Sequence, residues 1–246
     1  MAGAIKSYTD AFSLYLKNFT DYIIYSILAS FAGFILAIVA IVFIAMIGIL
    51  SQGGPAKLLS GASSMGAIQL SILLLVVLAG FLIFAWLIAG LVGAYLYTIN
   101  MFISGRKQTF AGFLGAIPKF ATDIFIFKII AGIAFIIPVA VVAVLASLLS
   151  MGSLMPIIVA IFTAIYSAII SLLLFFGIPA MVVHGKKPID AIKTSMALSV
   201  KNIISIIGFL LLSMVMFIPF LIPLYLPLLF VPVFSAALLM LYKGAR

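Results

Sequence analysis

The sequence predicts an all-α protein that is built into a membrane. Three observations indicate this: 67% of the residues are hydrophobic, 7% are charged, and the mean hydropathy is +1.51. A soluble domain carries about 25% charged residues, so this chain could not cover a folded surface with groups that favour water. The apolar runs lack the polar and apolar alternation of membrane barrel strands. Short polar segments separate these runs and contain all four acidic residues: Asp10, Asp21, Asp123 and Asp190.

Four apolar runs are each long enough for one membrane-spanning helix. About 20 helical residues, each rising about 1.5 Å, cross the hydrocarbon layer of ~30 Å. In the second run, Ala89 and Gly93 form a small-xxx-small pair that would let a neighbouring helix approach closely. The four runs cover residues 22–50, 68–104, 124–149 and 156–184.

A fifth uncharged run, residues 203–242, is too long for one crossing, because a straight helix of that length would extend about 60 Å. Proline removes a backbone donor and restricts the residue before it. We therefore expect a turn near Pro219, Pro223 and Pro227, with one span on each side. The prediction is six membrane-spanning helices in a single integral membrane domain, residues 1–246.

The basic residues predict how the chain is oriented. Lysine and arginine accumulate in cytoplasmic loops, and eleven of them lie before the first span, after the second and fourth, or at the end of the chain. The alternate loops hold only Lys57, and Lys128 lies inside a span. Both termini are therefore expected on the cytoplasmic side of the cell membrane. No cleaved signal peptide is expected, since residues 1–20 lack an apolar core and a small-residue cleavage site.

The net charge of +9 and the pI of about 9.8 have two interpretations. Such values are typical of nucleic-acid-binding proteins, but here the basic residues are spread over four segments without a dense cluster. Contact with anionic lipid headgroups on the cytoplasmic side is favoured, and no nucleic acid is expected. The residues expected to make this contact are Lys6, Lys17, Arg106, Lys107, Lys119, Lys186, Lys187, Lys193 and Lys201.

Three short amphipathic segments lead into spans: residues 4–21, 109–123 and 188–202. Apolar residues that recur every three or four positions are typical of a helix that lies in the membrane interface, with its apolar face in the lipid. The sequence therefore predicts three cytoplasmic interfacial helices. In the first segment the apolar positions are Ile5, Tyr8, Phe12, Tyr15, Leu16 and Phe19.

The polar segments also resemble one another. Lys17-Asn18 corresponds to Lys201-Asn202, and Gly105-Arg106-Lys107 resembles Gly185-Lys186-Lys187. A lysine and an amphipathic lead-in are needed wherever the chain passes from the cytoplasm into a span, so the likeness has a second explanation. We nevertheless predict a threefold repeat of interfacial helix, span and span. The repeats would cover residues 1–104, 105–184 and 185–246.

The chain resembles uncharacterised prokaryotic six-helix membrane families, among them the membrane domain that accompanies some glycerophosphodiester phosphodiesterases. The resemblance covers most of the chain and depends on A-I-K-x-x-x-x-x-F from Ala4, P-x-D-A-I-K from Pro188, and Lys201-Asn202. It implies a six-helix membrane fold. It implies no catalytic residues, because the soluble phosphodiesterase domain is not in this sequence.

Four residues are candidates for a polar site within the membrane: Lys128, Asn100, Asp123 and His184. Lys128 lies about 7.5 Å deeper than Asp123 along a helix. It either extends back to the headgroups or forms a buried pair or transport site. Asn100 either bonds a neighbouring helix or contacts a substrate. His184 is the only histidine, so it cannot form a metal site alone, and a pH-sensing role is its alternative.

The residue types present argue against catalysis. The chain has no cysteine, its loop serines have no histidine partner, and we expect no catalytic residue, metal or cofactor. No span has a central acid, which disfavours ion-coupled transport. The absence of cysteine, few asparagines and glutamines and much isoleucine favour a thermophilic source.

We therefore expect a non-enzymatic protein. It would be an accessory or pore-contributing subunit of a membrane assembly, or a lipid-organising protein. The alternative is a transporter or channel for a small or apolar solute, with the path between the helix repeats. An enzyme acting on lipid is the least supported class. The expected partners are membrane lipids, other membrane subunits and further copies of this chain.

Overall fold

The computed structural model describes residues 2–29, 67–148, 155–217 and 230–245, which are helical apart from short turns and contain no strand. The prediction of an all-α fold is confirmed for this part of the chain. The helices are α1 (Ala2–Lys17), the helix Phe19–Ala29, α4 (Ala67–Ile103), α5 (Phe110–Leu148), α6 (Met155–Leu173), α7 (Gly177–His184), α8 (Pro188–Lys201), α9 (Ile203–Phe217) and α10 (Val231–Gly244).

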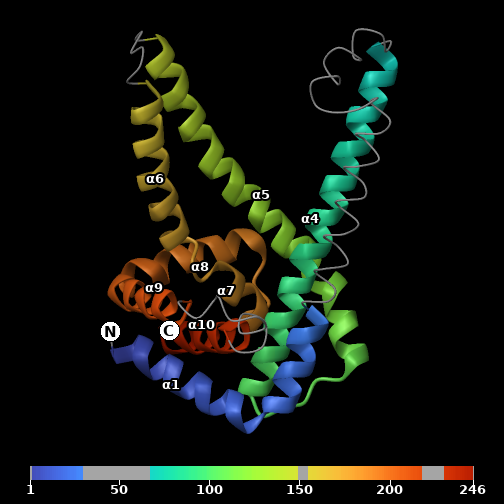
Figure 1. The fold of residues 1–246 in the computed structure, drawn as a ribbon, viewed down its shortest axis with the longest axis vertical. Helices are drawn as coiled ribbons and strands as arrows, with labels where there is room; N and C mark the ends of the chain where they lie inside the picture. The colour runs from blue at the N-terminus through green and yellow to red at the C-terminus, as the bar shows by residue number, and fades with distance from the viewer. Residues whose placement is uncertain (1, 30–66, 149–154, 218–229, 246) are drawn as a thin grey trace.

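Three long helices, α4, α5 and α6, rise from a base of shorter helices (Figure 1). α4 and α5 pack together near the base and diverge away from it, and α6 returns from the far end of α5. Both termini lie at the base, where α1 packs against α10. Three segments are long and apolar enough to cross a membrane: Leu78–Ile103, Phe110–Leu148 and Pro156–His184. The described helices are therefore compatible with a membrane location.

The described residues do not confirm the prediction of six spans. The predicted span 22–50 begins in the helix Phe19–Ala29 and otherwise lies outside the described residues. The turn predicted near Pro219, Pro223 and Pro227 also lies outside them. Within the described residues α9 has 15 residues and α10 has 14, fewer than the ~20 that one crossing needs, and residues 218–229 between them lie outside the description. α8 and α9 meet at a bend of 90° and would add a fourth crossing only if they are counted together.

The interfacial helix predicted for residues 109–123 is not a separate element. These residues form the first part of α5, which continues through Pro118 without a break. The reason is close packing against α4. A Cβ atom added to Gly93 would lie 2.4 Å from the Cβ of Phe120, and one added to Gly90 would lie 2.7 Å from the carbonyl oxygen of Ile117. The close approach predicted at Gly93 is confirmed, and it holds α5 on both sides of the proline.

The other two predicted interfacial segments are separate helices, α1 and α8, and they end in the same way. Each is followed by an asparagine in a turn, at Asn18 and Asn202. The Asn18 side chain donates a hydrogen bond of 3.1 Å to the carbonyl of Leu14, and the Asn202 side chain donates one of 2.9 Å to the carbonyl of Leu198. The side-chain amide thus occupies a helix-end carbonyl and allows the chain to turn into the next helix.

α1 has three distinct faces. The buried face packs on α9 and α10 and includes Tyr8 and Tyr15, which the sequence had assigned to the lipid-facing side. That assignment was wrong because an α-helix at about 100° per residue has room for two apolar faces, one towards protein and one outward. The outward apolar residues are Ile5, Phe12 and Leu16, and the exposed polar residues are Lys6, Asp10, Ser13 and Lys17.

α8 also has a buried face, an outward apolar face and a polar face. Around the helix axis these faces follow one another in the same order as on α1. Its buried face includes Ala191, Ser195 and Ser199. A helix that divides its surface among protein, apolar and polar surroundings fits the boundary between membrane and water. The exposed apolar residues of α8 are Ile189, Met196 and Val200, and its exposed charged residues are Asp190, Lys193 and Lys201.

Candidate functional site

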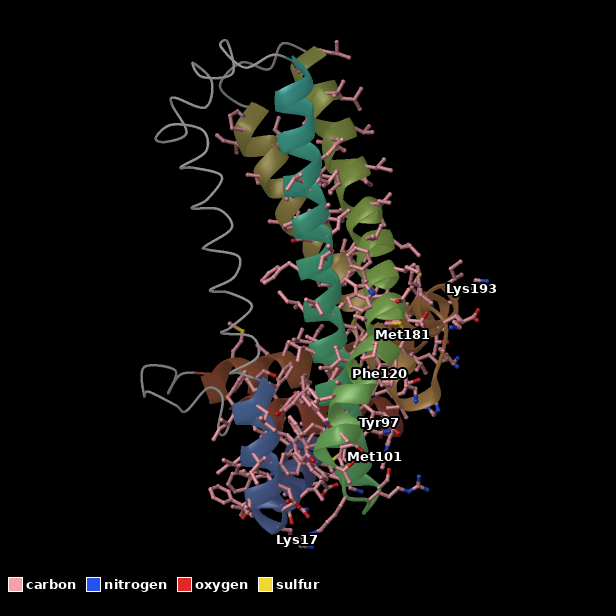
Figure 2. The ribbon with its side chains drawn as sticks, turned by 90° about the vertical axis from the view of Figure 1, so that its right-hand side faces the viewer. Lys17, Tyr97, Met101, Phe120, Met181 and Lys193 are labelled. Atoms are coloured by element: carbon pink, nitrogen blue, oxygen red, sulfur yellow. The ribbon has the colours of Figure 1, made fainter. Side chains whose placement is uncertain are left out.

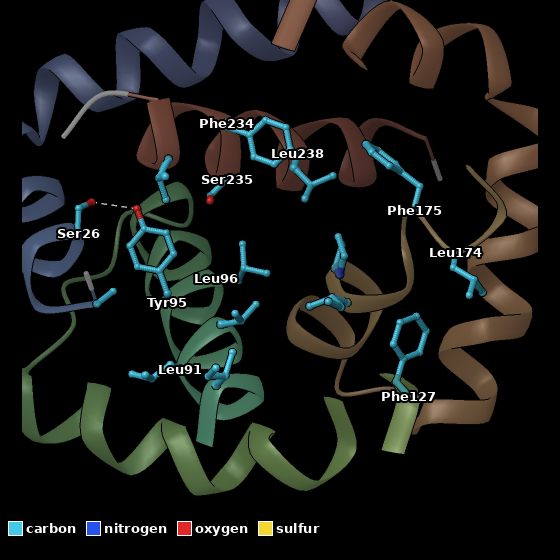
Figure 3. Close-up of a pocket in the computed structure, with 16 residues that line it drawn as sticks. Ser26, Leu91, Tyr95, Leu96, Phe127, Leu174, Phe175, Phe234, Ser235 and Leu238 are labelled. Atoms are coloured by element: carbon cyan, nitrogen blue, oxygen red, sulfur yellow. Dashed lines mark hydrogen bonds between the residues drawn. The ribbon is translucent and has the colours of Figure 1, made fainter. Parts of the chain in front are cut away.

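An apolar cavity of about 570 Å³ lies where the helix Phe19–Ala29, α4, α5, α7 and α10 meet (Figure 3). Sixteen described residues line it, and the hydroxyl-bearing ones are Ser26, Tyr95 and Ser235. The volume falls within the roughly 300–1,000 Å³ of ligand pockets in general. A lining of this kind gives water few hydrogen-bond partners and therefore suits hydrocarbon better than water.

The polar edge of the cavity is a hydrogen bond between two helices. Ser26 Oγ lies 2.9 Å from the hydroxyl of Tyr95, and both side chains are buried. Figure 3 shows this pair at one side of the cavity, with Leu91 and Leu96 of α4 nearby and Phe234 of α10 beyond them. One hydroxyl donates to the other, so the pair retains one O–H that could bond a single acceptor atom of a bound molecule.

A break between α6 and α7 forms another part of the wall. The turn carries Leu174 and Phe175 into the lining. The fully buried Ser195 of α8 satisfies the broken backbone, since its hydroxyl donates to the carbonyl of Leu173 at 2.8 Å and accepts from the amide of Phe176 at 3.0 Å. The Ser195 hydroxyl therefore replaces two backbone hydrogen bonds that are missing where the helix breaks. These bonds also fix the position of this part of the cavity wall.

α5 contributes a single ring to the cavity, and a glycine makes room for it. A Cβ atom added to Gly177, at the start of α7, would lie 2.2 Å from Phe127 Cζ. Phe127 is buried and lines the cavity beside Ile178 and Pro179 of α7. The missing side chain at Gly177 thus lets the ring of Phe127 lie against the α7 backbone.

The four predicted polar residues have different surroundings. Lys128 is exposed and follows Phe127 of the cavity wall, but it does not line the cavity itself. Asn100 is half-buried, and its Oδ1 atom has no hydrogen-bond partner among the described residues. Asp123 pairs with Lys187, with 3.3 Å between Nζ and Oδ2. The exposed His184 ends α7, with its ring centre 5.5 Å from that of Tyr242.

These contacts do not test whether the four residues form a polar site within the membrane, so that site stays a prediction.

Sequence reasoning missed the cavity, whose residues come from five segments far apart in the chain. In the part of the chain that the structure covers, no three histidine, aspartate or glutamate side chains lie together as metal ligands would.

Two ion pairs at the base have matching geometry. Asp21 lies 3.9 Å from Lys107, and Asp123 lies 3.3 Å from Lys187. Each lysine lies two residues after a glycine whose φ is positive: 69° at Gly105, before Lys107, and 61° at Gly185, before Lys187. That conformation favours glycine, which has no Cβ to clash with the backbone. In both cases a glycine in the left-handed backbone conformation follows a helix, and the lysine two residues later pairs with an aspartate at the beginning of a long apolar run.

The lysines and arginine predicted to contact lipid headgroups are exposed, apart from Lys186, which is half-buried and donates to Thr194 Oγ1 at 2.6 Å. Figure 2 shows Lys17 and Lys193 at the periphery of the base, whereas Tyr97 and Phe120 lie where α4 and α5 meet. The ammonium of Lys119 is 5.1 Å from the ring centre of Tyr97. These positions leave most of the basic groups free to meet an anionic surface.

Comparison of the chain with protein-family models, with curated proteins and with solved structures found no match. The resemblance to six-helix membrane families therefore stays a prediction from the sequence motifs, and the candidate site depends on its geometry.

Proposed function

We propose that this protein is a non-enzymatic, multi-pass membrane protein that organises lipid, and that its apolar cavity holds a hydrocarbon chain. The cavity is the observation that carries the proposal. It combines about 570 Å³ of space with a lining that is aliphatic and aromatic apart from the hydrogen-bonded hydroxyls of Ser26 and Tyr95 and the hydroxyl of Ser235. In a chain that lies in lipid, the most abundant molecule of this chemistry is an acyl chain.

The proposed architecture has six spans and three interfacial helices on the cytoplasmic face, arranged as a threefold repeat. Three matched features support the repeat: the ion pairs of Asp21 and Asp123, the left-handed glycines Gly105 and Gly185, and the asparagine turns after α1 and α8. The three-faced helices α1 and α8 support an interfacial position. The cavity would then lie among helices of all three repeats.

The proposed orientation places both termini in the cytoplasm of a prokaryotic cell. The excess of lysine and arginine in alternate polar segments supports it, and the two termini lie at the same end of the molecule (Figure 1). Anionic lipids are the proposed partners of this face. The exposed apolar surfaces of α5 and α6 would face lipid or, in an assembly, another membrane subunit or a second copy of the chain.

A transporter or channel for a small or apolar solute is the second candidate. The position of the cavity among several helices favours it, because a path between repeats would have to pass this point. The two candidates differ in a measurable way. A lipid-organising protein retains hydrocarbon without moving it, whereas a transporter accelerates its passage across a vesicle membrane.

Filling the cavity tests the proposal. Leu91 lines the cavity, so Leu91→Trp places a large ring in the space and is expected to lower binding of a fluorescent acyl-chain probe to the detergent-purified protein at least about tenfold, a loss of ~1.4 kcal/mol. The matched control is Leu82→Trp, the same change at an exposed position on α4. The control should bind like the unmodified protein. Unchanged binding by a folded Leu91→Trp protein would refute occupancy of the cavity.

The same variants separate the two functions. In vesicles that carry a fluorescent phospholipid in one leaflet, a lipid-organising protein leaves the exchange between leaflets at the rate of protein-free vesicles. Faster exchange that Leu91→Trp abolishes and Leu82→Trp preserves would instead support the transporter.

A further inference from the structure

A second cavity, of about 500 Å³, lies at the base between the first half of α1, the first turn of α9 and the last turn of α10. Its lining differs in kind from that of the first, because charged, hydroxyl and amide side chains face it. We propose that this cavity binds a monoanionic phosphodiester, the group that a phospholipid carries in its headgroup. The polar residues that line it are Lys6, Ser7, Asp10, Asn202, Ser205 and Lys243.

The charged side chains that line this cavity carry an excess of positive charge, which a bound anion would neutralise. Lys6 and Lys243 contribute two ammonium groups and Asp10 one carboxylate. Among the described residues, no ion pair within 4.0 Å joins these groups to one another or to any other side chain. Burial lowers the pKa of Lys243, because its ammonium loses part of its hydration. An anion between the two ammonium groups would restore the lost stabilisation, and the excess of one positive charge matches a monoanion better than a dianion.

Two helix ends and the side chain of Asn202 form part of the wall of this cavity. Gly3 near the amino end of α1 and Ser205 near the amino end of α9 line the cavity, and the amino ends of helices favour anions. Asn202 donates to the carbonyls of Leu198 at 2.9 Å and Ala245 at 3.3 Å. It thereby ties the start of α9 to the end of α10 and occupies a carbonyl that would otherwise repel an anion. The Asp10 carboxylate remains the opposing charge.

The position of the cavity on α1 is what a headgroup site requires. Lys6 and Asp10 belong to the exposed polar face of this helix, and Ser7 lies beside them at the border with its buried face. Ile5 and Leu16 extend on the outward apolar face. An interfacial helix in this orientation places the cavity at the level of lipid phosphates. The inference depends on the proposed membrane placement but not on the apolar cavity.

Native mass spectrometry of the full chain in mild detergent tests the site. The unmodified protein is expected to retain added phosphatidylglycerol in preference to an uncharged galactosyl diacylglycerol with the same chains. The double variant Lys6→Gln/Lys243→Gln should weaken phosphatidylglycerol retention by about thirtyfold, the effect of two basic residues near a membrane surface. Retention of the galactolipid should not change. Excess inorganic phosphate identifies the source of the anion: displacement of the lipid indicates a free phosphate site, and its persistence indicates the headgroup.

The matched control is Lys193→Gln/Lys201→Gln, which removes two exposed lysines of α8 and the same charge. Because Lys193 and Lys201 belong to the surface expected to meet anionic headgroups but do not line the cavity, this variant should weaken phosphatidylglycerol retention much less than Lys6→Gln/Lys243→Gln does. Equal retention by Lys6→Gln/Lys243→Gln and the unmodified protein would overturn the proposal, and so would an equal loss in the control. The acyl-probe assay with Leu91→Trp reports on the other cavity, so failure of one proposal is distinguishable from failure of the other.

Discussion

Replacing Gly93 with alanine is expected to lower the free energy of unfolding by about 3 kcal/mol, the upper range for overpacking of a well-packed interface. The new methyl group would lie 2.4 Å from the Cβ of Phe120 and 2.7 Å from Cδ1 of Ile124. The Cβ of Phe120 is fixed to its backbone and cannot rotate away. The clash can be relieved only if α4 and α5 move apart, and these helices form the most extensive contact in the described fold.

Gly132→Ala on α5 is the matched control for this prediction. Nothing lies within 4 Å of a Cβ atom at that position, and the glycine is inside a helix. Alanine favours a helix interior over glycine by about 1 kcal/mol, so this variant should be slightly more stable. Thermal unfolding of both variants in the same detergent measures the difference. Equal midpoints for the two would show that α4 and α5 do not pack as described.

Ser195→Ala is expected to destabilise the protein by about 2 kcal/mol, within the range for leaving buried hydrogen-bonding groups without a partner. The substitution removes one hydroxyl group but leaves two backbone groups unsatisfied, the carbonyl of Leu173 and the amide of Phe176. Because these groups lie at the break between α6 and α7, loosening should spread to the cavity wall. The variant should therefore also bind the acyl-chain probe more weakly.

One turn later on the same face of α8, Ser199 provides the comparison. It is 2% exposed, and its Oγ atom has no hydrogen-bond partner among the described residues. Ser199→Ala removes a buried hydroxyl that bonds to none of those residues, so stability should stay the same or rise slightly. Chemical unfolding of the two variants side by side checks the pair. A larger loss for Ser199→Ala than for Ser195→Ala would be inconsistent with the hydrogen bonds at the break.

Long apolar helices could be predicted from the sequence because their signal is local. The run 68–104 coincides closely with α4 (Ala67–Ile103), and the run 156–184 ends with α7 at His184. α5 was harder to predict. The amphipathic pattern of residues 109–123 predicts a separate interfacial helix, whereas contact with Gly90 and Gly93 of α4 keeps the helix continuous through Pro118. That contact joins residues far apart in the chain, and no window of neighbouring residues reveals it.

The candidate site could not be predicted for a related reason. Its lining residues are ordinary membrane-helix residues, and only the fold brings Tyr95, Phe127 and Phe234 to one place. Ser195 shows no sign in the sequence of its role at a break 19 residues earlier. The matched Gly105 and Gly185 were visible as similar motifs, and their shared backbone conformation gives that similarity a structural meaning.

The central claim is that α4, α5 and α6 cross a membrane and that the base lies on its inner side. The chain has no cysteine, so single cysteines can be introduced and labelled in intact cells with a membrane-impermeant maleimide. We expect Ser153→Cys, in the loop predicted to lie outside, to be labelled without permeabilising the cells. Ser104→Cys, which directly follows α4, and Ala197→Cys, on α8 of the base, change exposed residues and should react only after the cells are permeabilised. Labelling of either base position in intact cells, with Ser153→Cys protected, would contradict the account.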